Sequence, residues 1–232
     1  MTGPFQGGLP AERLHLRKVR FAVELQDAVT LLRVSEGVKV VAQGLKGKPV
    51  VNHAGLFVWL DSNVGDLQSL TVNPNLLPFE SATLMGSDLK DPLTTIELSP
   101  KVSYPFTFGI TGLRGRLIES RIYSHDPIPV QNAALHLQWL DSDDVWQEAP
   151  TVSHTDENGE FALILRLAPN QVPKLDVKDC VDCVTVRLSA TRDQGIPRSS
   201  DDLKILQGYV ADPSTFGGSP KALIFAWDEL QP

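Results

Sequence analysis

The two cysteines of the chain, Cys180 and Cys183, form a C-x-x-C pair, a spacing that serves metal binding or redox chemistry. A structural zinc site takes four ligands, and the sequence has no second pair of cysteines. A thioredoxin-like pair opens a helix, whereas this pair runs into residues 184–188, which have a strand pattern. We therefore expect two cysteines at the entrance of a strand, either reduced or bridged to each other. A metal site shared between subunits is the alternative.

Acidic side chains gather in two segments, and carboxylates in loops are ligands that calcium prefers. The candidates are Asp141, Asp143, Asp144, Asp156 and Glu157. We expect the two loops to come together at one end of a β-sandwich. The ligand spacing of an EF-hand loop is absent, so we interpret these residues as solvated turn carboxylates. No metal and no cofactor is predicted.

Four tryptophans offer flat apolar rings on which a sugar can stack. Trp59 and Trp139 stand at the ends of strand patterns, so we expect them to pack in cores. Trp146 lies in the acidic loop and is the best exposed candidate. Together with Asp143 and Asp144 it makes the predicted ligand- or partner-binding group, and carbohydrate is one ligand class that would suit it.

The five histidines show no catalytic pattern. His136 alternates with two leucines, so we expect it on the solvent face of a strand. His154 precedes a polar turn, where a capping hydrogen bond is the simplest role. The sequence contains no G-x-S-x-G nucleophile elbow, no P-loop and no G-x-G-x-x-G fingerprint. We therefore predict that the protein is not an enzyme.

Short strand patterns, spaced by about 10–15 residues, predict an all-β protein with two consecutive transthyretin-like or Ig-like β-sandwich domains. The prediction divides the chain into a flexible arm (1–12), a first sandwich (13–100), a linker (101–106) and a second sandwich (107–232). The linker is predicted from two prolines, Pro100 and Pro105, which interrupt strands. The expected strands are 14–25, 38–42, 56–60, 69–72, 81–85, 94–98, 111–119, 135–139, 161–165, 184–191, 203–210 and 223–227. We also consider a bulge near 17–18, a short strand at 172–175 and a short helix at 10–14 or 200–206.

Residues 155–161, Thr-Asp-Glu-Asn-Gly-Glu-Phe, form a polar turn, and we interpret residues 161–165 after it as an alternating strand. Asp156 and Gly159 suit a tight turn, and Phe161 opens the strand that follows. A similar element occurs earlier, where Gly55 precedes Phe57 by two residues. In both places we predict a β-hairpin that carries a phenylalanine into a core.

Three ordered pieces extend this pattern over residues 112–166. A strand at 113–118 contains Gly115, Pro129-Val130 leads to the small residues 132–134, and the turn 155–161 follows. This order resembles the carboxypeptidase regulatory-like family, a transthyretin-like β-sandwich related to Cna-B-type modules. The resemblance implies a fold and no catalytic activity. The first half of the chain departs from the pattern, because His53-Ala54 replaces the acidic turn residues.

Enzymes with similar sandwiches provide two further comparisons. Hydroxyisourate hydrolases of the transthyretin-like type end in Tyr-Arg-Gly-Ser, whereas this chain ends in other residues. Intradiol dioxygenases hold iron with two tyrosines and two histidines, and the His-x-His spacing of that family is absent. A metalloenzyme of this type, using Tyr123, His125 and His154, is kept as an alternative function.

The formal net charge of −7 argues against a general nucleic-acid binder. Residues 13–48 are nevertheless rich in lysine and arginine, and the acidic excess lies in the second half.

The sequence shows no secretory signal pattern and no long apolar segment, so we expect a cytoplasmic protein or part of a particle assembled in the cytoplasm. Regulatory-like modules occur beside phage-tail-like contractile injection systems, as cap or accessory components. We therefore expect a structural subunit that binds protein partners, itself included, and the alternative is a carbohydrate- or surface-ligand-binding module.

Overall fold

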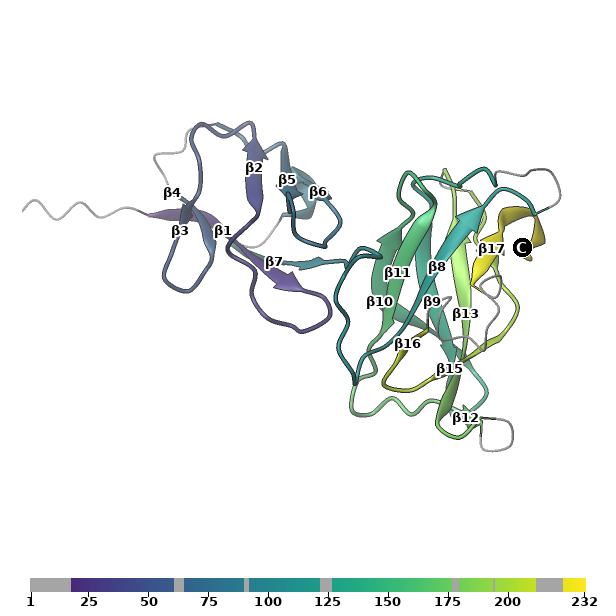
Figure 1. Cartoon of the computed structure of the whole chain (residues 1–232). Coiled ribbons are helices and arrows are strands. Elements are labelled where there is room, and N and C mark those ends of the chain that lie inside the picture. Colours follow the sequence, from purple (N-terminus) through teal and green to yellow (C-terminus); the bar gives the residue numbers. More distant parts are fainter. Residues whose placement is uncertain are drawn as a thin grey trace, which may run out of the picture.

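The computed structural model describes residues 18–60, 65–89, 92–121, 127–176, 180–193, 195–211 and 223–232. The predicted arm 1–12, the possible helix at 10–14, Tyr123 and His125 lie outside these ranges. Within them the fold is all-β, and its helical pieces are two short 3-10 turns, η1 (Gly86–Asp88) and η2 (Trp227–Glu229). The strands gather in two bodies, one from each half of the chain (Figure 1).

The N-terminal half, residues 18–100, contains two sheets. A four-stranded sheet has the order β3-β4-β1-β7, in which β7 runs parallel to β1. A three-stranded sheet has the order β2-β5-β6. The strands are β1 (Val19–Asp27), β2 (Lys39–Gln43), β3 (Val50–Val51), β4 (Phe57–Leu60), β5 (Ser69–Asn73), β6 (Ala82–Met85) and β7 (Leu93–Leu98).

The C-terminal half, residues 107–232, also contains two sheets. One is built on the path β10-β9-β13-β12, with β14 and β15 also paired to β13; the other has the order β11-β8-β16, with β17 also paired to β8. The strands are β8 (Thr111–Ile118), β9 (Ala134–Leu140), β10 (Trp146–His154), β11 (Glu160–Leu165), β12 (Leu175–Asp176), β13 (Cys183–Thr191), β14 (Arg198–Ser199), β15 (Leu203–Leu206), β16 (Val210–Ala211) and β17 (Ile224–Ala226).

Each half encloses its own apolar core between its two sheets. Trp59 is fully buried in the N-terminal core and stacks on Phe21, with 4.4 Å between ring centroids. Trp139 is buried in the C-terminal core. Both tryptophans are therefore core residues, as predicted. Among the described residues, strand pairing stays within each half.

Strand β10 is absent from the sequence-based prediction, which treated its residues as an acidic loop. Pro150 and the nearby Glu148 hide the strand pattern. Proline is tolerated because β10 is an edge strand and its pairing with β9 shifts between Glu148 and Val152, which is where Pro150 lies. Two other predictions are wrong: 203–210 is interrupted by a turn between β15 and β16, and 200–206 is not helical.

Strand β11 buries both of its faces. Phe161 and Leu163 point into the C-terminal core, whereas Ile164 belongs to the cluster of the N-terminal core. This explains why residues 161–165 form a continuous apolar run instead of an alternating one. A single strand thus contacts both cores.

Three turns share one hydrogen-bonding pattern, at 52–56, 141–145 and 156–160. The side-chain oxygen of the first residue accepts a hydrogen bond from the N–H of the fifth, at 2.8–2.9 Å. The N–H of the fourth residue donates to the carbonyl of the first. That fourth residue has a positive φ of 78°, 62° or 74° in the three turns. The first and fourth residues are Asn52 and Gly55, Asp141 and Asp144, and Asp156 and Gly159.

The three turns differ in what they connect. Turn 52–56 joins β3 to β4 in one sheet, so the hairpin predicted around Gly55 and Phe57 is confirmed. Turn 141–145 is likewise a hairpin, between β9 and β10. The hairpin predicted around Asp156, Gly159 and Phe161 is wrong, because β10 and β11 belong to different sheets. This turn carries the chain across the core.

Phe161 pairs with Gly115 on β8, the neighbouring antiparallel strand of the same sheet. A Cβ atom at Gly115 would lie 2.7 Å from the Phe161 ring and 2.8 Å from the Leu223 carbonyl oxygen. The glycine is thus required by close packing, as the sequence pattern suggests.

Phe161→Ala is expected to lower the free energy of unfolding by about 3–5 kcal/mol, because the ring is 1% exposed and its removal leaves a cavity. Urea unfolding monitored by tryptophan fluorescence measures the effect. Phe108→Ala is the matched control, since that ring is 78% exposed. Equal losses for the two variants would contradict the assignment of Phe161 as a core anchor.

Candidate functional site

The two halves meet at the carboxylate of Glu80, which lies just before β6. Its side chain is 18% exposed. One oxygen accepts a hydrogen bond from the Ser153 hydroxyl at 2.5 Å, and both oxygens lie 3.1 Å from the backbone nitrogen of His154. Ser153 and His154 end strand β10 of the other half. The Glu80 carboxylate of the N-terminal half is therefore stabilised by hydrogen-bond donors of the C-terminal half.

The His154 ring approaches the same carboxylate. Its Nδ1 atom lies 3.5 Å from Oε2 of Glu80. The hydrogen bond with Glu80 raises the pKa of His154 above its ordinary value of 6.5, partial burial opposes this, and the charge of Glu80 adds to the increase. The side chain remains half-exposed, so the electrostatic gain is screened by solvent.

This arrangement of serine, histidine and carboxylate is not a catalytic relay. A nucleophilic serine needs a histidine that accepts its proton, and the carboxylate should orient that histidine. Here the Ser153 hydroxyl donates directly to Glu80, and its residue is 1% exposed. The chemistry that the cluster supports is anchoring of one half to the other.

Additional contacts extend the junction. The Ser99 hydroxyl donates to the Val152 carbonyl oxygen at 2.7 Å, and Arg166 lies 3.8 Å from Glu97. Ile164 supplies the apolar part of the contact. The junction thus combines a buried apolar side chain with polar contacts on both sides of it.

The segment predicted as a linker is itself held in place. The Tyr104 hydroxyl donates to Asp27 at 2.6 Å, and burial followed by this hydrogen bond raises the pKa of Tyr104. Asp27 also accepts hydrogen bonds from the Val29 N–H and the Thr30 hydroxyl, so its buried carboxylate is satisfied. On the opposite side, Arg114 of β8 donates to the Tyr104 carbonyl.

A cavity of about 460 Å³ opens at the junction. Its walls come from both halves and from the segment between them. They carry hydroxyl, amide, carboxylate and ammonium groups together with apolar residues. The lining residues are Glu80, Ser81, Thr83, Lys101, Val102, Asn132, His154, Thr155, Asp156, Glu160 and Phe161.

The two acidic loops do not meet, contrary to the prediction. They lie at opposite ends of β10, whose nine residues span roughly 30 Å. Hydrogen bonds from the Val145 N–H and the Gln147 amide lower the pKa of Asp141. Both oxygens of this carboxylate are therefore occupied by residues of its own hairpin. Asp144 pairs with Lys174, whereas Asp143 is exposed. Glu157 lies in the distant turn with Asp156.

Trp146 belongs to strand β10 instead of a loop, and it is half-buried. The Arg187 guanidinium stacks over its ring, 3.8 Å from the centroid, and Arg187 is oriented by Gln138. One ring face is therefore already occupied. The most exposed aromatic pair in the described chain is Phe108 and Tyr209, which no sequence pattern singled out.

His136 lies on the outer face of β9, beside Glu148, with 3.1 Å between Nδ1 and Oε1. Cys180 and Cys183 are bonded to each other at the entrance of β13, in agreement with the bridged alternative.

No group of three or more His, Cys, Asp or Glu side chains in the described ranges has the arrangement of a metal site. In the same ranges no helix is long and apolar enough to cross a membrane.

Comparisons with protein-family models, curated proteins and solved structures return nothing that matches this chain. The resemblance to the regulatory-like family therefore rests on the residues of 112–166 alone.

Glu80→Ala is expected to lower the free energy of unfolding by about 1–3 kcal/mol, because the Ser153 hydroxyl and the His154 N–H lose their acceptor. Urea unfolding gives the measurement, and Glu36→Ala, at an exposed position, is the control. A Glu80→Ala variant as stable as Glu36→Ala would mean that the junction does not depend on this carboxylate.

The raised pKa of His154 predicts a pH dependence of stability. The stabilisation is fully present below the unfolded value near 6.5 and is lost as pH rises through the higher folded value. The change is small, because the ring is half-exposed. Unfolding measured from pH 5 to 8.5 should show this loss in the wild type and in His53→Gln, but not in His154→Gln. Identical slopes for all three proteins would assign the effect to other groups.

Proposed function

We propose that this protein is a non-enzymatic assembly subunit made of two transthyretin-like or Ig-like sandwiches held in a fixed relation. The observation that supports it best is the junction at Glu80. Its carboxylate, hydroxyl and backbone groups form hydrogen bonds that join the two halves. A rigid pair of sandwiches presents its loops and strand edges at set distances, which is what a structural subunit needs.

Open strand edges supply contact surfaces for this role. β2 and β6 end one sheet of the N-terminal half, and β3 ends the other. Both residues of β3, Val50 and Val51, are exposed. An unpaired edge is a template for pairing with another chain unless it is protected. Protein partners, a second copy among them, are therefore the proposed ligands.

The uneven charge of the chain suggests how copies would attract one another. Basic residues concentrate in 18–48, including the exposed Lys48, while the C-terminal half carries the exposed acidic Asp156, Glu157 and Asp143. Opposite charges on different parts of one subunit favour association between copies. A cap or accessory component of a phage-tail-like contractile particle, assembled in the cytoplasm, is the assembly that the family resemblance suggests.

We expect the protein to self-associate at low ionic strength and to dissociate as salt is added, because salt screens charge attraction. The Debye length falls from about 30 Å at 0.01 M to about 3 Å at 1 M ionic strength. Analytical ultracentrifugation across this range measures the mass. A monomer at every salt concentration would refute self-association.

A further inference from the structure

Phe108 and Tyr209 form an aromatic pair on the surface of the C-terminal half, outside both cores. The two residues are 78% and 46% exposed, and neither belongs to a core cluster. Their ring centroids are 4.9 Å apart, and their planes meet at 88°. The two rings, here called the aromatic corner, therefore contact each other at a right angle while most of the Phe108 ring meets water.

Hydrogen-bonded backbone carries the aromatic corner. Phe108 lies just before β8 and Tyr209 just before β16, and these two strands are parallel neighbours. The Gly109 N–H donates to the Gly208 carbonyl at 2.8 Å, and the Gly208 N–H donates to the Thr111 hydroxyl at 2.8 Å. The two segments are thus bonded to each other and to β8. Groups held in place before a ligand arrives bind it at a lower entropic cost.

A cavity of about 280 Å³ opens beside the aromatic corner. Its lining comes from residues 106–108, from Arg114 of β8 and from residues 208–210. Phe106 supplies a third ring, and the Arg114 guanidinium lies over that ring, 4.6 Å from its centroid. Single exposed apolar side chains are common on proteins, whereas rings gathered around a cavity with a few polar groups are typical of a ligand site.

The size and shape of the cavity indicate the class of ligand. Small-molecule sites usually measure about 300–1,000 Å³, so this cavity suits a single small ring. Two aromatic rings at a right angle offer one apolar surface below a ligand and a second beside it. A hexose has a flat C–H face and hydroxyl groups around its edge. Partners for those hydroxyl groups are present in the same lining, on Thr107, Tyr209 and Arg114.

We propose that the aromatic corner binds one hexose unit of a neutral saccharide. The C–H face of the sugar stacks on the Phe108 ring, and Tyr209 contacts its side. Trp146, the sugar platform expected from the sequence, is less suited because Arg187 already covers one face of its ring. A saccharide site would let the assembly subunit attach to a glycan, and it does not depend on self-association.

A proline-rich peptide is the other class of ligand that aromatic grooves bind. A polyproline helix has three residues per turn and rises about 3.1 Å per residue, so a peptide of several prolines needs several ring positions along a groove. Here Phe108 and Tyr209 make one corner, and polar groups line the same cavity. This arrangement favours a single sugar ring, and the peptide is included as an outcome of the test.

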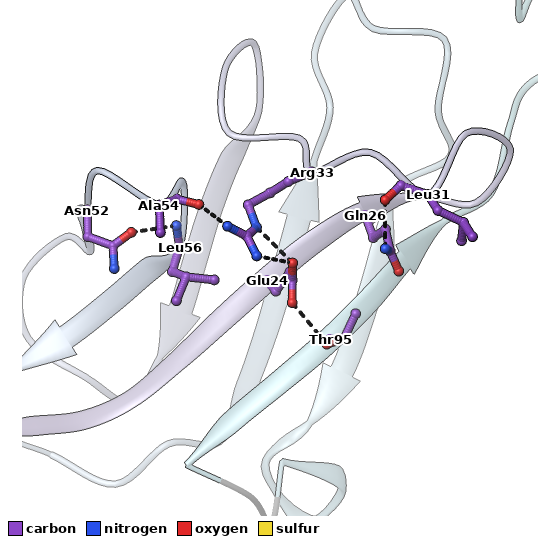
Figure 2. Close-up of polar contacts among 8 residues, drawn as sticks. All are labelled: Glu24, Gln26, Leu31, Arg33, Asn52, Ala54, Leu56 and Thr95. Carbon is purple, nitrogen blue, oxygen red and sulfur yellow. Dashed lines mark hydrogen bonds and ion pairs between the residues drawn. The ribbon is translucent and has the colours of Figure 1, made fainter.

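Leu31 and Leu32 provide a matched comparison on the N-terminal half. They are 47% and 68% exposed. Their loop is also tied to its surroundings, because the Gln26 amide donates to the Leu31 carbonyl at 2.7 Å and Arg33 donates to the Ala54 carbonyl (Figure 2). The loop is thus apolar, exposed and hydrogen-bonded, but it contains no aromatic residue. It distinguishes stacking on a ring from unspecific apolar contact.

Saturation-transfer NMR tests the site, with maltose, cellobiose and lactose as separate probes. We expect transfer from the wild-type protein to at least one of them. Phe108→Ala should raise the dissociation constant of that sugar by at least about tenfold, because the stacking contact is lost. Leu32→Ala, the control, should bind as the wild type does. Both variants should keep the wild-type melting temperature, since the replaced side chains are exposed.

Tyr209→Phe separates the ring from its hydroxyl. This variant keeps both rings of the corner, so it should weaken sugar binding less than Phe108→Ala does. A greater loss for Tyr209→Phe than for Phe108→Ala would contradict stacking as the main contact.

Three further outcomes would overturn the proposal. One is the absence of transfer to all three sugars, and another is equal sugar binding by Phe108→Ala and the wild type. The third is a proline-rich peptide that binds the wild type but not Phe108→Ala, while the sugars do not bind. None of these results changes the sedimentation of the protein at low salt, so the saccharide site and self-association can fail independently.

Discussion

The arrangement of the two halves depends on β11, a strand with no solvent-facing side. Phe161 and Leu163 complete the C-terminal core, and Ile164 reaches the cluster of the N-terminal core. Because side chains alternate along a strand, β11 cannot serve one core without presenting Ile164 on its other face. An apolar side chain there must be covered, and the N-terminal half covers it. The junction is therefore a consequence of how the C-terminal half is built.

Covering that face also buries polar groups, which must then find partners. Glu80 accepts hydrogen bonds from the end of β10, and Ser99 donates to the same strand. Each bond alone contributes modestly, but removing one partner leaves a desolvated group behind. In the segment between the halves, the buried Tyr104 hydroxyl likewise finds a partner, because it donates a hydrogen bond to Asp27. The prolines suggest that segment 101–106 is a spacer. In the structure, Tyr104 of this segment is hydrogen-bonded to both halves.

Most strands could be predicted from the sequence because they alternate or form apolar runs. β10 could not, since an edge strand with a bulge tolerates Pro150, which normally indicates a loop. The same omission placed Trp146 in a loop and brought two acidic segments together that β10 holds apart. The junction residues Glu80 and Ser153 have no local signal at all. Their role arises from contacts between residues more than 70 positions apart.

The three related turns show where local sequence stops being informative. An Asn or Asp at the first position and a residue with positive φ at the fourth fix the backbone of the turn itself. They do not decide whether the strands on either side pair with each other. Two of the turns make hairpins, while 156–160 sends the chain from one sheet to the facing one. In the sheet that the chain enters, Phe161 pairs with Gly115 of β8, whose missing side chain leaves space for the phenylalanine ring. The turn with the clearest sequence signature thus determines architecture only together with a glycine more than forty residues away. Function must be sought on the surfaces that this architecture positions.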